Sequence, residues 1–138
     1  MKLLFDENFG RPLIDAIKHL VQFSRDSAEV RHILELQVPG VKDADWVPRL
    51  AAEQWVVISG DRGRSAGPKL PQLCRAYGIT HVLLSGALQN SPQFEKARAV
   101  LGLWPGLLAL GDEPPGARYM LRYGPARQPV LVAKPFEA

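Results

Sequence analysis

Short apolar stretches alternate with amphipathic segments along most of the chain. The apolar stretches predict strands, and they cover residues 2–6, 29–36, 55–59 and 79–85. The segments that follow them space apolar side chains three and four positions apart, which predicts helices over residues 11–21, 43–53, 68–77 and 91–101. This repeated alternation of strand and helix predicts an α/β fold with a parallel central sheet and right-handed crossovers.

The boundaries of these elements carry start and stop signals. Asn8 or Gly10 opens the first helix, and Pro12 lies in its first turn, where the missing N–H does no harm. Asp43 is the expected N-cap of the second helix. The run WVVIS at 55–59 is almost continuously apolar, which predicts a central strand that is covered on both faces.

Beyond Trp104 the pattern changes, because proline and glycine become frequent. Residues 117–123 and 129–134, separated by GPARQ, predict an antiparallel hairpin at one edge of the sheet. The chain has 138 residues, of which 46% are hydrophobic, and this suits one domain with a genuine core. We therefore expect a single domain over 1–138, with its core over 1–104 and a hairpin extension over 105–138.

Composition also bounds where the protein works. No run of about eighteen apolar residues is present, and the N-terminal sequence reaches Asp6 too early for a signal peptide. We expect a cytoplasmic protein with no membrane segment. The only cysteine, Cys74, cannot form an internal disulfide, and its place in an amphipathic helix predicts a packed thiol.

The charge is distributed unevenly. Residues 1–61 contain 7 Lys and Arg against 10 Asp and Glu, whereas residues 62–138 contain 10 against 4. An acidic centre beside a basic surface suits a nuclease, because carboxylates hold cations while Arg and Lys hold phosphates. The alternative is a solvated surface whose asymmetry arose by chance.

Acids end two of the predicted strands. Asp6 and Glu7 follow the first strand, and Asp61 follows the third. Ligands of open α/β sheets bind outside the carboxyl ends of the strands, so carboxylates there indicate a metal. Asp43 and Asp45 open the second helix, but two positions on a helix do not point the same way, and only one of them is expected to join the site.

These segments together resemble a known family. The runs MKLLFDENF at 1–9, GVKDADWVPRLAAEQWVVISGD at 40–61 and ITHVLLSGAL at 79–88 are similar to the bacterial PIN-like domains related to VapC toxins. The resemblance implies a three-layer α/β/α fold with strand order 2-1-3-4 over about residues 1–104. It also implies RNA cleavage with Mg²⁺ or Mn²⁺.

The resemblance assigns roles to particular acids. Asp6, Glu7, Asp43 and Asp61 match the catalytic set, of which Asp6, Asp43 and Asp61 would bind the metal, and Asp45 is a possible addition. Arg62 and Arg64 would contact RNA phosphates, unless they are ordinary loop charges exposed to solvent. The expected partners are RNA, a cognate antitoxin protein and, in a homodimer, a second copy of the chain.

The sequence departs from the family pattern in two places. Many relatives have a basic residue and a threonine where this chain has Ser59 and Gly60, and no acid occurs from Arg62 through Phe94. A PIN-like binding module that has lost catalysis is therefore one alternative. The three tryptophans could stack unpaired bases, but their apolar settings favour packing in the core.

A phosphoacceptor receiver domain is the other alternative. Asp61 would accept the phosphoryl group, Asp6 and Glu7 would bind Mg²⁺, and Ser85 and Lys134 would complete the site. Lys134 comes 73 residues after Asp61 and only four residues follow it, which leaves no room for the final helix of that fold.

Overall fold

A parallel sheet with one antiparallel edge forms the centre of the molecule. The computed structural model describes residues 1–23, 28–36, 42–60 and 70–134. Within them the sheet has six strands in the order β2-β1-β3-β4-β5-β6. The strands are β1 (Lys2–Phe5), β2 (Glu29–His32), β3 (Trp55–Ser59), β4 (Thr80–Leu84), β5 (Arg118–Tyr123) and β6 (Pro129–Ala133). The predicted α/β class and the order 2-1-3-4 are confirmed.

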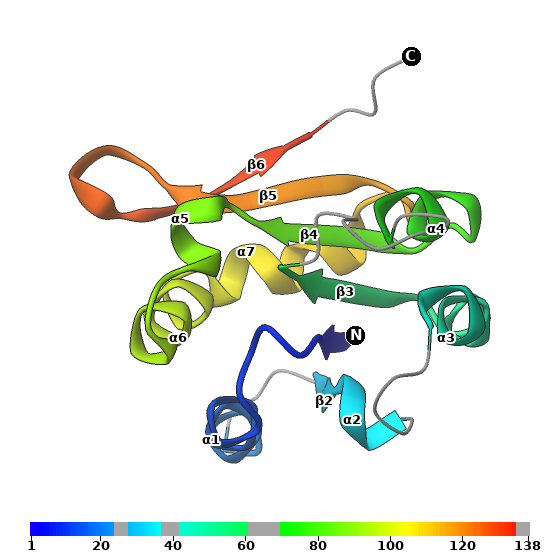
Figure 1. Cartoon of the computed structure of the whole chain (residues 1–138), viewed down its shortest axis with the longest axis horizontal. Coiled ribbons are helices and arrows are strands. Elements are labelled where there is room, and N and C mark those ends of the chain that lie inside the picture. The colour runs from blue at the N-terminus through cyan, green and yellow to red at the C-terminus, as the bar shows by residue number, and fades with distance from the viewer. Residues whose placement is uncertain (24–27, 37–41, 61–69, 135–138) are drawn as a thin grey trace.

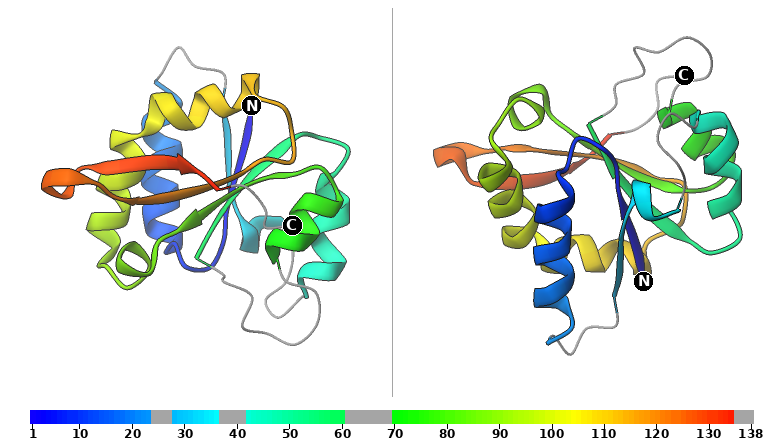
Figure 2. Two further views of the ribbon diagram at one scale, coloured as in Figure 1. Left: turned by 90° about the horizontal axis from the view of Figure 1, so that it is seen from above. Right: turned by 60° about the horizontal axis from the view of Figure 1, so that its bottom comes forward.

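Helices cover both faces of this sheet, so the molecule has three layers (Figures 1 and 2). The helices are α1 (Arg11–Val21), α2 (Ile33–Leu36), α3 (Asp43–Leu50), α4 (Leu70–Ala76), α5 (Gly86–Gln89), α6 (Gln93–Gly102) and α7 (Trp104–Ala109). Short 3₁₀ turns follow at η1 (Leu110–Asp112) and η2 (Pro125–Arg127).

Alternation along the strands divides the apolar residues between two cores. On β1, Leu3 and Phe5 pack with α1, α5, α6 and α7, whereas Leu4 packs on the opposite face with α2, α3 and α4. Every residue of β3 and β4 is buried. Central strands that are covered on both faces need this nearly continuous apolar pattern, which is why 55–59 was recognisable from the sequence.

The strand order reverses between β1 and β3. The chain leaves β1 through α1 to reach β2 on one side, and it returns through α2 and α3 to β3 on the other side of β1. The parallel register pairs Phe5 with Ile58, so the carboxyl ends of β1 and β3 lie side by side. This is the position at which open α/β sheets bind ligands.

The structure corrects two predicted elements. The expected strand 29–36 stops at His32 and becomes helix α2, because Glu35 Oε2 accepts the His32 N–H at 2.6 Å and His32 Nδ1 accepts the Leu34 N–H at 3.1 Å. These side-chain bonds to the backbone close a helical turn. Helix α3 ends at Leu50 instead of residue 53, and Gln54 adopts a left-handed backbone with φ of 53° before β3 begins.

The C-terminal hairpin is confirmed as the edge of the sheet. Strand β5 runs parallel to β4, and β6 returns antiparallel to β5, with Leu121 opposite Leu131. Helix α7 was not expected in this part of the chain, where Trp104 is followed by proline and glycine. None of the helices in the described parts of the chain is long and apolar enough to span a bilayer.

Candidate functional site at the ends of β1 and β3

The carboxylate of Asp6 lies directly after β1, where the strand order reverses. Its Oδ1 accepts the Asn8 backbone N–H at 3.0 Å, and its Oδ2 accepts Asn8 Nδ2 at 3.0 Å and the Gly60 N–H at 3.3 Å. The Asp6 N–H in turn donates to Ile58 O at 3.1 Å. These bonds join the ends of β1 and β3 and fix the orientation of the carboxylate.

Gly60 permits this close approach. A Cβ atom at Gly60 would lie 2.6 Å from Asn8 Cγ and 2.8 Å from Asn8 Oδ1, which is far inside van der Waals contact. The missing side chain therefore lets Asn8 bond to Asp6 while the backbone of residue 60 passes beside it. Gly60, where many relatives have a larger residue, therefore leaves room for the bond between Asn8 and Asp6.

The loop between β1 and α1 is held from two sides. Lys96 Nζ of α6 donates to Asn8 O at 2.9 Å, and Gln93 of the same helix donates to Asn8 O at 3.3 Å and accepts the Gly10 N–H at 2.9 Å. On the β2 side, His32 Nε2 bonds to Phe9 O at 2.8 Å. Since His32 Nδ1 accepts an N–H, Nε2 must be the protonated nitrogen.

Lys96 is an unusual cation because only 5% of its surface is exposed. It shares the buried face of α6 with Ala99 and Val100. Burial lowers the pKa of the Lys96 ammonium, and the nearby negative charge of Asp6 opposes that shift. Asp6 therefore provides compensating charge for a buried lysine as well as facing the site.

Strand β3 ends in a buried polar pair. Ser59 Oγ lies 2.7 Å from His81 Nε2, and both residues are almost fully buried. This pair links the last residue of β3 to β4 immediately before Gly60. It therefore fixes the direction in which the chain leaves β3.

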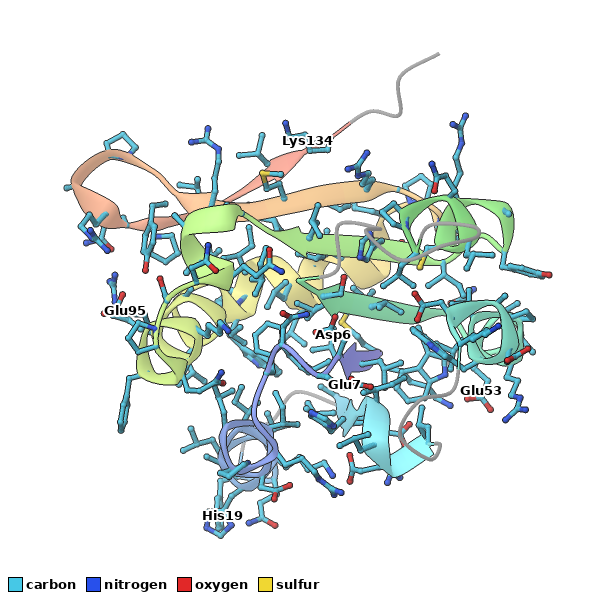
Figure 3. The ribbon with its side chains drawn as sticks, in the orientation of Figure 1. Asp6, Glu7, His19, Glu53, Glu95 and Lys134 are labelled. Carbon is cyan, nitrogen blue, oxygen red and sulfur yellow. The ribbon has the colours of Figure 1, made fainter. Side chains whose placement is uncertain are left out.

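The other predicted acids have different surroundings. Glu7 is exposed beside Asp6 after β1 (Figure 3), and Asp45 is exposed on α3. Asp43 is half-buried, and its Oδ1 accepts the indole N–H of Trp46 at 2.9 Å. The N-cap of α3 is Lys42, so the expected capping role of Asp43 was wrong. Instead, Asp43 bonds to a buried tryptophan one helical turn ahead.

Asp43 also borders the α3 side of the core. Burial in that core, together with the negative charge of Asp43, raises the pKa of the Cys74 thiol to about 12. Cys74 is fully buried, as expected for a packed thiol. Trp46 and Trp55 are each 5% exposed and belong to the same core, which supports packing over base stacking for these two residues.

Three predicted site residues, Asp61, Arg62 and Arg64, lie outside the described residues. Within residues 1–23, 28–36, 42–60 and 70–134, no three His, Cys, Asp or Glu side chains are grouped so that they could hold a metal ion. The described part supplies the Asp6 carboxylate, and Asn8 keeps an amide oxygen because its Nδ2 is the donor to Asp6. Both are hard oxygen donors of the kind that Mg²⁺ and Mn²⁺ prefer.

The position of Lys134 excludes the arrangement of a receiver domain. Its backbone N–H donates to Arg118 O at 2.7 Å, at the start of β5. Since β5 is parallel to β4, Lys134 lies toward the amino ends of the parallel strands, at the end of the sheet opposite Asp6. Figure 3 shows Lys134 after the outer strand β6, with Asp6 near the centre of the view.

The comparison with known families agrees with this architecture. A family model described as a PIN like domain matches residues 1–86, more than half of the chain, including β1, β3 and the loop from Asp6 to Gly10. The chain belongs to the PIN-like domain family. No curated protein and no solved structure gives a significant match.

For this PIN-like domain, sequence reasoning missed the residues of α6 that support the site. Gln93 and Lys96 are 85 and 88 positions away from Asn8, the residue whose carbonyl they hold. One signal was present, because Lys96 shares a helical stripe with Ala99 and Val100, and a lysine on a buried face needs a polar partner. Nothing in the sequence identified that partner as the Asn8 carbonyl in the loop between β1 and α1.

Proposed function

We propose that this PIN-like domain is a metal-dependent ribonuclease, in which Asp6 and Asp61 hold a Mg²⁺ or Mn²⁺ ion for hydrolysis of RNA phosphodiesters. The observation that carries the proposal is the Asp6 carboxylate, which N–H groups of Asn8 and Gly60 hold at the reversal of strand order. Family membership supports nuclease chemistry at this position. A carboxylate that is already oriented loses little freedom when it binds a cation.

The residues of the chain take distinct roles in this proposal. Asp6 and Asp61 bind the cation, and Asp43 completes its shell directly or through water. Glu7, exposed beside Asp6, orients a ligand or the attacking water. Arg62 and Arg64 contact the phosphates that flank the cleaved bond. The bound cation would lower the pKa of a water nucleophile and offset charge on the phosphate oxygens.

An RNA-binding module without catalysis is the second candidate. The observation that favours it is Lys96, which places a positive charge near Asp6 where a nuclease of this type would bind metal. Under this alternative the basic half of the chain holds RNA, and a partner such as an antitoxin controls access to it. RNA binding without cleavage at saturating Mn²⁺ would favour this candidate.

The deciding experiment combines metal binding with cleavage. Mn²⁺ is titrated into wild type, Asp6→Asn and Asp61→Asn by calorimetry, and cleavage of a single-stranded RNA is followed in the same buffer. We expect each variant to lose cleavage by about a thousandfold, because each removes a charged metal ligand. Asp15→Asn, an exposed acid on α1, is the matched control and should behave as wild type. Retained cleavage in both variants rules out the assigned site.

The partners stay predictions with their own test. The resemblance of the sequence to VapC-related domains implies a small antitoxin that covers the site, and a homodimer is the second expected assembly. Light scattering of the purified chain measures the dimer directly. Inhibition of RNA cleavage by a co-purified small protein, relieved when that protein is degraded, would support the antitoxin.

A further inference from the structure

One buried lysine stands beside the carboxylate that the proposed ribonuclease uses. Lys96 comes from α6, which follows the family-matched segment, and only 5% of its surface is exposed. An ammonium group buried this deeply is costly unless it is hydrogen-bonded and has a negative charge near it. Lys96 has both, because its Nζ donates to Asn8 O at 2.9 Å and Asp6 supplies the negative charge.

The contacts around Asn8 connect this lysine to the site. Asn8 offers its N–H and its Nδ2 to the two oxygens of Asp6, and its carbonyl faces Lys96. A displacement of the lysine is therefore transmitted through a single residue to the carboxylate. Because Lys96 is only 5% exposed, it has little surface for direct contact with RNA, and we assign it a role through Asn8 and Asp6 instead.

We propose that Lys96 is a built-in cation of the site, which supplies the charge that a second metal ion supplies in two-metal nucleases and so limits the site to one divalent cation. The inference rests on the proposed ribonuclease. Two-metal nucleases use a pair of ions about 4 Å apart to balance their carboxylates and the substrate phosphate. Here a fixed positive charge next to Asp6 repels further cations and weakens the binding of the first one.

The charge role and a structural role predict opposite changes in metal affinity. Lys96→Met keeps most of the apolar stem but removes the charge, so we expect Mn²⁺ to bind about tenfold more tightly. If Lys96 served only to hold the Asn8 carbonyl, the same substitution would loosen Asp6 and weaken Mn²⁺ binding. Gln93→Ala is the matched control, because it removes another donor to the Asn8 carbonyl without changing charge.

Calorimetry with Mn²⁺ alone provides the first readout. We expect tighter binding in Lys96→Met, wild-type affinity in Lys96→Arg, and equal or weaker binding in Gln93→Ala. Unchanged or weaker Mn²⁺ binding in a folded Lys96→Met overturns the inference. If wild type binds one Mn²⁺ and only this change in affinity fails, the proposed ribonuclease survives. If neither wild type nor Lys96→Met binds Mn²⁺, the proposed ribonuclease and the proposed role of Lys96 are both wrong.

A second readout needs no variant and so does not depend on the stability of Lys96→Met. Electron paramagnetic resonance of wild type at excess Mn²⁺ distinguishes a single bound ion from a spin-coupled pair. We expect one tightly bound ion with no coupled-pair signal. A coupled pair in wild type overturns the inference while supporting metal-dependent chemistry.

Discussion

Asp6 and Asp43 are both acids at the boundary of an element, yet their surroundings differ. Asp6 receives N–H groups from the loop after β1 and from Gly60, which is 54 positions away in the chain. Asp43 accepts the indole N–H of Trp46, one turn ahead on the same helix, and its charge also acts on the buried Cys74. A sequence signature shared by two acids therefore does not give them equal roles.

The difference shows which observation is informative about a site. An acid at a helix start finds a partner three positions ahead whether or not it has a function. An acid that bonds to chain segments following both β1 and β3 needs a tertiary arrangement that local preference does not provide. We therefore weight Asp6 above Asp43 as a metal ligand.

The largest expected effect concerns the reactivity of Cys74, which is buried near Asp43. The pKa of the Cys74 thiol is raised from 9.0 to about 12, first by burial and then by Asp43. Since thiolate is the reactive form, alkylation at pH 8 should be at least about a hundredfold slower in folded than in unfolded protein. Thiol-reagent kinetics with and without denaturant measure the ratio. Asp43→Asn should raise the folded rate, and equal rates in the two states would contradict this assignment.

Gly60→Ala tests the packing around Asp6, because it adds a methyl group where the side chain of Asn8 lies. The new methyl group would meet Asn8 Cγ, so Asn8 must turn away from Asp6, and we expect a loss of about 2 kcal/mol in unfolding free energy. Cleavage should fall with it, because Asp6 loses a bond that orients it. Denaturant unfolding and RNA cleavage are the measurements.

The control for Gly60→Ala is a double-mutant cycle with Asn8→Ala. In that background the methyl group has room, so most of the cost of Gly60→Ala should disappear. A cost that is the same in both backgrounds would show that the contact with Asn8 is not its cause.

Asp43→Ala tests the hydrogen bond between Asp43 and the indole N–H of Trp46. The substitution leaves a buried indole N–H without this acceptor, and we expect a loss of about 1 kcal/mol in unfolding free energy. Asp43→Asn keeps an acceptor and should lose less. Cleavage should fall by about tenfold at most if Asp43 acts through water. A loss of cleavage as large as that of Asp6→Asn would show that the two acids are equally important and would contradict the distinction between them.

The smallest expected effect concerns Glu35, an acid away from both Asp6 and Asp43, whose lowered pKa makes its contribution to stability depend on pH. Burial would raise the pKa of Glu35, but hydrogen bonds from Lys18 and from the His32 N–H lower it below 4.5. Its contribution is therefore present above about pH 4.5 and is lost as pH falls through the folded pKa. Glu35→Gln should lose about 0.5 kcal/mol at pH 7 and less at pH 3. Asp112→Asn is the exposed control, and an equal loss at both pH values would contradict the sign.

Much of the fold was predictable because strands and helices leave periodic patterns. Residues 11–21 and 55–59 match α1 and β3 as predicted, since their apolar positions face single cores. The turn into α2 was not predictable from periodicity, because side chains of His32 and Glu35 bond to the backbone there. Helix α5 was missed although Ser85 caps it by accepting the Leu88 N–H, since four residues are too few to show a period.

The site was predictable only in part. A carboxylate after a buried strand is visible in the sequence, and this placed Asp6 correctly at the carboxyl end of β1. The supporting contacts depend on how α6 packs against the loop at residues 6–10, and no local pattern encodes that distance of more than eighty positions. The assignment of Asp61, Arg62 and Arg64 stays a prediction.

The contacts made by α6 bear on how a minimal fragment of this protein should be designed. The family match stops at residue 86, within α5, whereas Gln93 and Lys96 hold the Asn8 carbonyl from beyond that border. A fragment that ends with the matched segment would keep Asp6 but lose α6, which holds the loop beside it. Recombinant fragments and domain grafts should therefore extend at least through Gly102, where α6 ends.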